Sequence, residues 1–109
     1  MSPLALGIDA GSSGSRWLLR NAAEVVGEGE LGPLSGLSYL ATGTDRVKEL
    51  AAAVRDVSER APAAVVAGVT GLSTGDPVAE RIRREIASEL GTLLDRVQVL
   101  DDITLLYRT

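Results

Sequence analysis

Hydrophobic and polar positions divide the N-terminal part of the chain into short apolar runs joined by short polar links. The runs predict three consecutive strands, over residues 4–9, 15–20 and 23–31. The first link, over 10–14, is rich in Gly and Ser, and Asn21-Ala22 form the second. Because links this short join antiparallel neighbours, this part of the chain predicts a three-stranded meander. Residues 32–44, rich in Gly, Pro, Ser and Thr, predict an exposed loop.

Residues 45–60 have the periodicity of a helix with one buried face. Apolar side chains recur at steps of three and four, at Val47, Leu50, Ala51, Val54 and Val57. Thr44 or Asp45 is the expected N-terminal cap, and Pro62 follows the end of the helix.

A second helix is predicted after Asp76. Asp76 is suited to cap it and Pro77 to occupy its first position. Apolar residues then follow at steps of four, at Val78, Ile82, Ile86 and Leu90. Gly91 suits the left-handed conformation that commonly ends a helix.

Two further strands are predicted on either side of this second helix. Residues 64–70 are continuously apolar, which is typical of a parallel strand buried on both faces. Residues 96–100 form the last short strand, and residues 103–109 have the composition to begin another helix. The element order β-β-β-α-β-α-β predicts one α/β domain with a mixed five-stranded sheet and helices on its faces.

Composition limits both the core and the chemistry. The chain has 109 residues, of which 45% are hydrophobic, enough for one domain with a real core. Only 3% are aromatic, so Leu, Val, Ile and Ala must fill that core. Cys and His are absent, which excludes disulfides, thiol catalysis, Ser-His triads and typical zinc sites.

Charge and hydropathy limit the classes of binding partner and the cellular location that we expect. The net charge of −4 argues against a nucleic-acid partner. No apolar run approaches the roughly 20 residues of a membrane span, and no signal peptide is visible. We therefore expect a cytoplasmic protein without a membrane partner. Self-association is left open by the sequence.

The link after the first strand is the strongest candidate site. The strand ends in Asp9, and a turn rich in Gly and Ser follows it over 10–14. Small residues let backbone N–H groups approach an anion closely. A carboxylate beside a phosphate becomes favourable when a divalent cation lies between them. The pattern therefore predicts a phosphate loop with a metal, although a turn that merely begins with Asp explains the same residues.

Polar residues also follow the two later strands. Thr70-Gly71 come after strand 64–70, and Asp101-Asp102 come after strand 96–100. If these strands run parallel to the first, their carboxyl ends share one rim of the sheet, where ligands of α/β proteins gather. Taken singly, the Thr is a polar strand end and the Asp pair a solvated helix start.

Four segments together resemble a known family. The run LGIDAGSSGSRWLL resembles the first phosphate motif of the actin-like, sugar kinase and Hsp70 ATPase superfamily, and VQVLDD resembles its second. The segments GELGPLSGLSYLATGTDRV and AVVAGVTGLSTGDPVAERI are similar to the N-acetylglucosamine kinase and BadF-BadG-BcrA-BcrD type ATPase group. The similarity spans nearly the whole chain and implies a ribonuclease-H-like N-terminal lobe. It implies ATP, Mg²⁺ and a sugar as ligands.

The resemblance also implies roles for individual residues. Asp9 would help to hold Mg²⁺, and the loop carrying Gly11, Ser12, Ser13 and Ser15 would bind the ATP phosphates. Asp102 would take the proton of the attacking sugar hydroxyl and lie near the metal. The residues expected toward the substrate are Thr70, Gly71, Ser38 and Thr44.

Departures from the family pattern leave other functions open. Family members commonly carry Asp-Gly-Gly-Gly-Thr-Lys-Thr, whereas this chain has Ser12 in place of a Gly and Gly14 in place of the Lys. The run DAGSSGSR is closer to the first conserved region of apyrases. The alternatives are a BadF-type ATPase acting as a conformational switch or enzyme activator, an apyrase-like phosphohydrolase, and an inert binding module. Because only seven residues follow Asp102, we expect a single lobe, 1–109, that ends before the second lobe and is nearly inactive alone.

Overall fold

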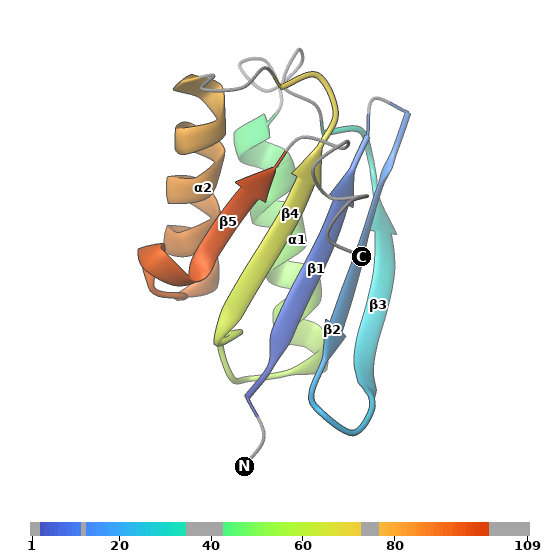
Figure 1. The fold of residues 1–109 in the computed structure, drawn as a ribbon. Helices are drawn as coiled ribbons and strands as arrows, with labels where there is room; N and C mark the ends of the chain where they lie inside the picture. The colour runs from blue at the N-terminus through green and yellow to red at the C-terminus, as the bar shows by residue number, and fades with distance from the viewer. Residues whose placement is uncertain (1–2, 12, 35–42, 73–76, 101–109) are drawn as a thin grey trace.

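The structure is a computed structural model, and it describes residues 3–11, 13–34, 43–72 and 77–100. Figure 1 shows a sheet with two helices packed behind it. The elements, in chain order, are β1 (Ala5–Ala10), β2 (Ser15–Arg20), β3 (Val25–Leu31), α1 (Thr44–Val57), β4 (Ala64–Val69), α2 (Pro77–Leu90), the short 3-10 helix η2 (Leu94–Arg96) and β5 (Val97–Leu100). The α/β fold and its mixed five-stranded sheet are therefore as predicted, with each strand and helix end displaced by three residues at most.

The strands lie in the order β3-β2-β1-β4-β5. β1 pairs with β2, and β2 with β3, in antiparallel register, which confirms the meander. β1 pairs with β4, and β4 with β5, in parallel register. The carboxyl ends of β1, β4 and β5 consequently share one end of the sheet, as the candidate site requires.

Both described helices cover the same face of the sheet (Figure 1). Burial alternates along β1, where Leu6, Ile8 and Ala10 are buried and the residues between them are exposed. The core between sheet and helices is aliphatic apart from Trp17; its largest fully buried side chains are Leu6, Leu19, Leu50, Ile82, Ile86, Val47, Val54, Val65, Val69 and Val97. A core of Leu, Val, Ile and Ala is thus confirmed, with one aromatic addition.

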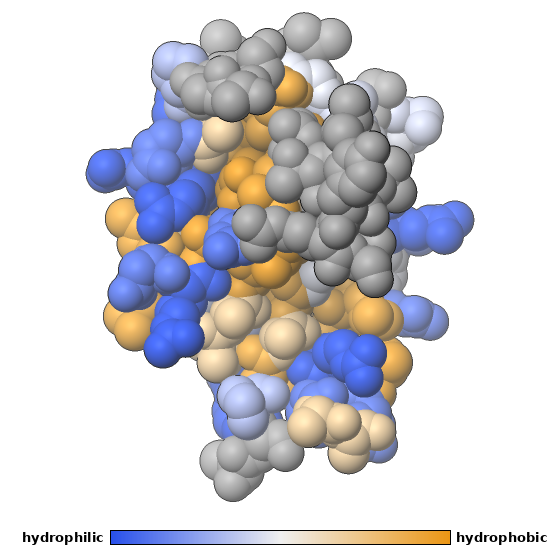
Figure 2. Space-filling model, in the orientation of Figure 1, coloured by the Kyte–Doolittle hydropathy of each residue, from blue (hydrophilic) through white to orange (hydrophobic). Residues whose placement is uncertain are grey.

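The opposite face of the sheet, which we call the open face, is not covered by either described helix. Figure 2 shows an apolar band along its middle with hydrophilic side chains on both sides. Val66 of β4 is only partly buried because it lies on this face. The expectation that residues 64–70 are buried on both faces is therefore met only in part. The helix face of β4 is buried, whereas on the open face Gly68 is buried and Ala64 and Val66 are partly buried.

The helix ends agree with the sequence at Pro77 and Gly91 and disagree at both ends of α1, which finishes at Val57, three residues before the predicted end. Pro77 begins α2, and Gly91 adopts a φ of 71° immediately after it, as predicted. Asp76 lies outside the described residues. The predicted side-chain cap of α1 is wrong, because the cap position is occupied by Gly43, which has no side chain to cap the helix. Thr44 is already helical, and its hydroxyl donates to Glu85 Oε1 of α2 at 3.1 Å.

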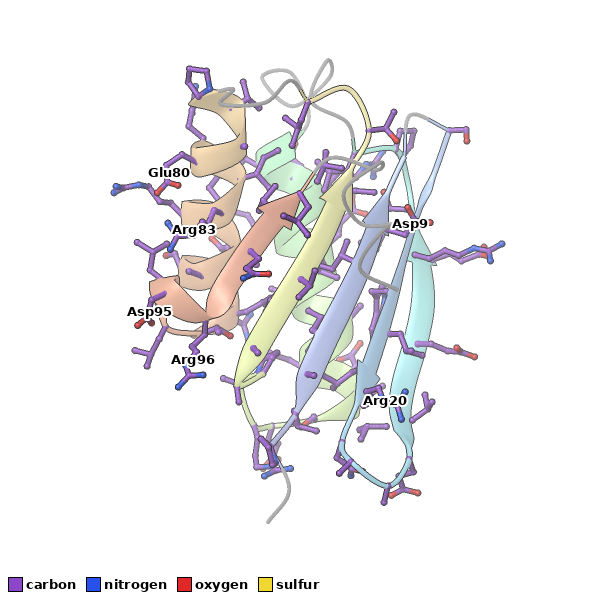
Figure 3. All side chains as sticks on the ribbon, viewed as in Figure 1. Asp9, Arg20, Glu80, Arg83, Asp95 and Arg96 are labelled. Atoms are coloured by element: carbon purple, nitrogen blue, oxygen red, sulfur yellow. The ribbon has the colours of Figure 1, made fainter. Side chains whose placement is uncertain are left out.

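Arg83 fastens α2 to the segment that leads into β5. Its Nε donates to the carbonyl of Val97 and its Nη2 to that of Leu94, both at 2.8 Å. Its Nη1 contacts Glu80 on the same helix at 3.0 Å (Figure 3). Because a guanidinium presents several donors in a fixed plane, one side chain holds three groups at once. These contacts join α2 to the first residue of β5 and to the 3-10 helix before it.

Candidate active site

The candidate site lies at the carboxyl end of the parallel strands. Asp9 is the last residue but one of β1, and Thr70 and Gly71 follow β4 directly. The N–H of Thr70 donates to the carbonyl of Ala10 at 2.9 Å. The structure therefore brings the end of β4 against the start of the β1–β2 hairpin loop, as the shared rim predicted.

The hairpin loop is closed by its own backbone. The Gly11 N–H donates to the Gly14 carbonyl at 3.0 Å, and the Gly11 carbonyl accepts from the Leu34 N–H at 3.0 Å. A Cβ on Gly11 would lie 2.9 Å from the Gly14 oxygen, so the turn requires glycine at this position. In this conformation the Gly11 N–H is therefore already bonded within the hairpin.

The amides left for an anion are those of Ser13 and Gly14. No backbone hydrogen bond between described residues outside the helices and strands uses either N–H. Ser12, which stands between Gly11 and Ser13, lies outside the described residues. The described loop thus offers two successive N–H donors next to Asp9, fewer than the sequence suggested.

Side chains of the hairpin divide between the two faces of the sheet. Asp9 and Arg16 are exposed and pair across β1 and β2, so both lie on the open face. Ser15 belongs to the opposite, buried set of β2 and is only 4% exposed. Its Oγ is buried without a hydrogen-bond partner. Such an orphaned hydroxyl costs stability, which makes it a candidate for bonding a ligand or water.

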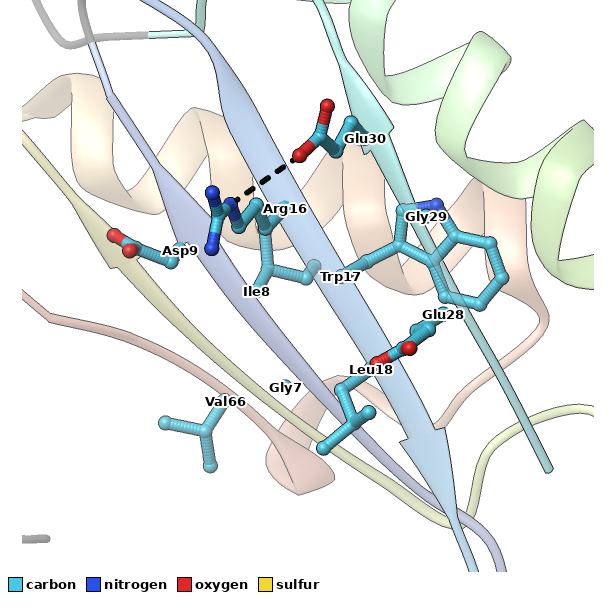
Figure 4. Close-up of a pocket in the computed structure, with 10 residues that line it drawn as sticks. All are labelled: Gly7, Ile8, Asp9, Arg16, Trp17, Leu18, Glu28, Gly29, Glu30 and Val66. Atoms are coloured by element: carbon cyan, nitrogen blue, oxygen red, sulfur yellow. Dashed lines mark ion pairs between the residues drawn. The ribbon is translucent and has the colours of Figure 1, made fainter. Parts of the chain in front are cut away.

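A cavity of about 330 Å³ lies at this end of the open face. It is lined by Asp9, Ser13, Gly14, Ser15, Arg16, Glu30 and Leu31. A second hollow of about 690 Å³ continues along the open face (Figure 4). Gly7, Leu18 and Val66 give it an apolar lining, and Asp9, Arg16 and Glu30 line both hollows. The polar hollow at the hairpin is the one that suits a charged ligand.

Arg16 and Glu30 were not among the residues that the sequence pointed to. Their Nε and Oε1 atoms lie 3.5 Å apart across β2 and β3, and both side chains are about three-quarters exposed. The missed signal is the strand register. In a tight hairpin that joins Ala10 to Ser15, Arg16 must pair with Asp9 and share its face.

The remaining predicted residues fall in two groups. Ser38, Asp101 and Asp102 lie outside the described residues. Thr44 is exposed at the start of α1 and bonds to Glu85, whose other oxygen, Oε2, is buried without a partner. In the part of the chain that the structure describes, no three carboxylates come together to hold a metal ion. A cation at Asp9 would therefore depend on water, phosphate oxygens or a carboxylate from elsewhere.

Comparison with family models and with curated proteins gave no match. Comparison with solved structures gave several. A candidate N-acetylglucosamine kinase from Chromobacterium violaceum superposes with a TM-score of 0.60 and 19% identity, over 93% of this chain and 35% of that one. The glucose complex of a glucokinase from Balamuthia mandrillaris gives a TM-score of 0.61 and 15% identity, over 94% of this chain and 30% of that one.

The chain shares its fold with part of each of these two kinase structures. A Ppx/GppA family member from Aquifex aeolicus shares the fold with a TM-score of 0.53 and 18% identity, over 94% of this chain and 36% of that one. The chain thus spans about a third of the length of these proteins. At these identities the likeness establishes the fold of the lobe and not its ligand.

The length and hydropathy of the described helices were also compared with those of membrane-spanning helices. Between residues 3 and 100, leaving out the undescribed positions, no helix combines the length and the apolar character needed to cross a bilayer.

Proposed function

We propose that this chain is the N-terminal, phosphate-binding lobe of an ATP-dependent kinase that phosphorylates a sugar hydroxyl, with N-acetylglucosamine as the first substrate to test. The observation that carries the proposal is the position of Asp9. It lies at the carboxyl end of β1 beside a glycine hairpin, in a lobe that has the fold of two sugar-kinase structures.

The donors around Asp9 suit Mg²⁺ and a phosphate chain. Mg²⁺ prefers carboxylate oxygens and keeps several waters, and Asp9 is an exposed carboxylate that lines the polar cavity. The amides of Ser13 and Gly14 are donors for phosphate oxygens. When bound, Mg²⁺ would neutralise charge on the transferring phosphoryl group. The chain's own contribution is to hold the phosphates between the loop amides and the Asp9 carboxylate.

Residues after β4 and β5 complete the proposed site. We assign Asp102 as the general base that takes the proton from the sugar hydroxyl. Thr70, Gly71, Ser38 and Thr44 are assigned to the sugar side. Thr70 supports this arrangement. Its N–H donates to the carbonyl of Ala10, the residue just before the phosphate loop, so Thr70 lies beside that loop.

Phosphoryl transfer as proposed also requires a second lobe. This chain corresponds to about a third of the sugar-kinase chains it matches. A single lobe leaves the nucleotide open to water, which competes with the sugar for the phosphoryl group. The chain described here is therefore expected to bind Mg·ATP weakly and to transfer little.

A second candidate is an enzyme that cleaves phosphoanhydrides with water, or an ATPase that uses cleavage as a conformational switch. One residue of the hairpin favours this second candidate: Gly14 occupies the position where kinases of the family carry Lys. A Ppx/GppA family member also shares the fold. Product analysis of a two-lobed protein that carries this sequence separates the candidates: sugar phosphate indicates a kinase, and sugar-independent release of phosphate indicates a hydrolase or a switch.

Binding can be tested on the chain itself by amide NMR with a non-hydrolysable ATP analogue. We expect Mg²⁺-dependent shifts at Ser13, Gly14 and Thr70. Asp9→Asn should abolish the dependence on Mg²⁺, because the neutral amide is a poor Mg²⁺ ligand. Asp56→Asn, which removes the same charge from an exposed position on α1, is the matched control. An analogue that shifts no hairpin amide at millimolar concentration, with or without Mg²⁺, would overturn the proposal.

A further inference from the structure

Three charged side chains form a row across the open face at the hairpin end. Asp9 of β1 pairs with Arg16 of β2, and Arg16 pairs with Glu30 of β3. Figure 4 shows the guanidinium between the two carboxylates. All three side chains line the polar cavity that also contains Ser13 and Gly14. A cation is therefore built into the candidate phosphate site at a position that the loop sequence alone does not indicate.

The contact between Arg16 and Glu30 leaves most of the guanidinium available. Arg16 Nε lies 3.5 Å from Glu30 Oε1. The terminal nitrogens point away from Glu30, toward the side of Asp9 (Figure 4). No second ion pair involves Arg16 among the described residues. Because exposed ion pairs of this kind are weak, Glu30 orients the side chain without neutralising it for other partners.

The net negative charge of the row would repel a polyphosphate unless a cation offsets it. Asp9 and Glu30 carry two negative charges against one positive charge on Arg16, and a polyphosphate adds several more negative charges. Mg²⁺ at Asp9 would offset part of that repulsion. The loop supplies amides but no lysine, since Gly14 occupies the family's Lys position. Arginine binds phosphate oxygens through two parallel N–H bonds, which suits terminal nitrogens turned toward the cavity.

We propose that Arg16 is the phosphate-binding cation of this site and that Glu30 positions its guanidinium through Nε. The proposal rests on the proposed function, because it assumes that the hairpin binds a phosphate chain. It assigns the ligand class to a phosphoanhydride, such as pyrophosphate or the β- and γ-phosphates of a nucleotide. It assigns to Arg16 binding alone, with no covalent step.

The test is an NMR titration of the whole chain with Mg²⁺ and pyrophosphate. The amides of Ser13 and Gly14 report the affinity, and the Arg16 Nε–H resonance reports direct contact. We expect Arg16→Gln to weaken binding at least ten-fold and Arg16→Lys to restore part of the loss. Arg20→Gln is the matched control, because Arg20 lies on the same strand and face at the far end from Asp9 (Figure 3).

The two proposals fail in different ways. If the unmodified chain shows no Mg²⁺-dependent shift, the proposed function fails and this inference fails with it. If the unmodified chain binds and Arg16→Gln binds equally well, the Arg16 assignment is overturned while the phosphate site stands. If Arg20→Gln weakens pyrophosphate binding as much as Arg16→Gln does, the effect is general charge attraction, and the assignment is also overturned.

Glu30 is tested against Glu28, which lies on the same strand and the same face. Glu30→Ala and Glu28→Ala each remove one negative charge, but only Glu30 lines the polar cavity. Loss of repulsion alone would therefore make Glu30→Ala the tighter binder, the opposite of what loss of the contact with Arg16 predicts. We expect Glu30→Ala to bind pyrophosphate two- to five-fold more weakly than Glu28→Ala. Glu30→Gln, which keeps the acceptor oxygen, should recover the difference. Equal affinities of the two Ala variants would overturn the positioning role.

Discussion

Gly29 of β3 lies directly against the indole of Trp17 on β2. A Cβ placed on Gly29 would come within 2.7 Å of Trp17 Nε1 and 2.9 Å of its Cε2. Trp17 is 5% exposed and belongs to the core, so the ring has little room to move aside. Gly27, two residues earlier on β3, has a similar contact with Val57, but Val57 is 41% exposed at the last residue of α1.

These two glycines give the first prediction. Gly29→Ala should lower the free energy of unfolding by about 1–3 kcal/mol, because a buried ring must shift to admit the methyl group. Gly27→Ala should cost less than about 1 kcal/mol, since an exposed helix end can move. Urea unfolding followed by Trp17 fluorescence measures both, as the chain has one Trp. A larger loss for Gly27→Ala than for Gly29→Ala would contradict this explanation.

The hairpin glycine gives the second prediction. Gly11→Ala forces a methyl group to 2.9 Å from the Gly14 carbonyl oxygen, a backbone atom that cannot rotate away. We expect a loss of about 1–3 kcal/mol in the free energy of unfolding, with the hairpin amides displaced in the NMR spectrum. Gly7→Ala on β1, the strand that leads into the hairpin, is the control. Its added Cβ meets nothing within 4 Å, so stability should stay level or rise by up to about 1 kcal/mol.

The elements with strong local signals are those that the sequence predicts well. Pro77 at the start of α2 and Gly91 just beyond its end are fixed by backbone geometry, which depends on the residue itself. The end of α1 facing the site is different. Thr44 has the chemistry of a cap, but Glu85 lies 41 positions away and accepts its hydroxyl hydrogen bond. A partner that distant in the chain leaves no local pattern.

The candidate site likewise contains residues that the local sequence predicts and residues that only the strand register brings together. Asp9 and the glycine hairpin are recognisable from consecutive residues, and the shared strand ends follow from the element order. Arg16 becomes part of the site only through its register with Asp9, and Glu30 only through its register with Arg16. Burial of the Ser15 hydroxyl depends on which face the helices cover, which is a property of packing rather than of the loop sequence.

Arg83 gives the third prediction, because its neighbour Arg84 provides a matched comparison. Arg83 donates to the carbonyls of Val97 and Leu94, whereas Arg84 makes an exposed ion pair with Glu80 alone among the described residues. Arg83→Lys should cost about 1–2 kcal/mol, since one ammonium group cannot reach both carbonyls in the same geometry. Arg84→Lys should change stability by less than about 0.5 kcal/mol.

Hydrogen exchange locates the effect of the Arg83 substitution. The amides of β5 should exchange faster in Arg83→Lys than in the unmodified chain, while those of β2 keep their relative protection, because the lost contacts hold the entry to β5. Equal losses of stability in Arg83→Lys and Arg84→Lys would show that charge, and not the pair of carbonyl contacts, is what Arg83 contributes.

Ser15 gives the fourth prediction, in which stability changes and ligand binding does not. Its Oγ is buried without a partner, so Ser15→Ala should raise the free energy of unfolding by about 1 kcal/mol by removing a desolvated hydroxyl. Ser15 belongs to the lining of the polar cavity beside Asp9, but its side chain lies on the covered face of the sheet. The same variant should therefore leave Mg²⁺-dependent binding of the ATP analogue unchanged.

The exposed Ser13 is the control for Ser15, because Ser13→Ala removes a hydroxyl from the same loop without relieving burial. Thermal unfolding and the NMR titration should be run on both variants. A stabilised Ser15→Ala that binds the analogue as tightly as the unmodified chain would assign the hydroxyl no ligand role. A destabilised Ser15→Ala would mean that the hydroxyl has a partner in solution, and the orphaned group would then be explained by bound water rather than by a site held open for phosphate.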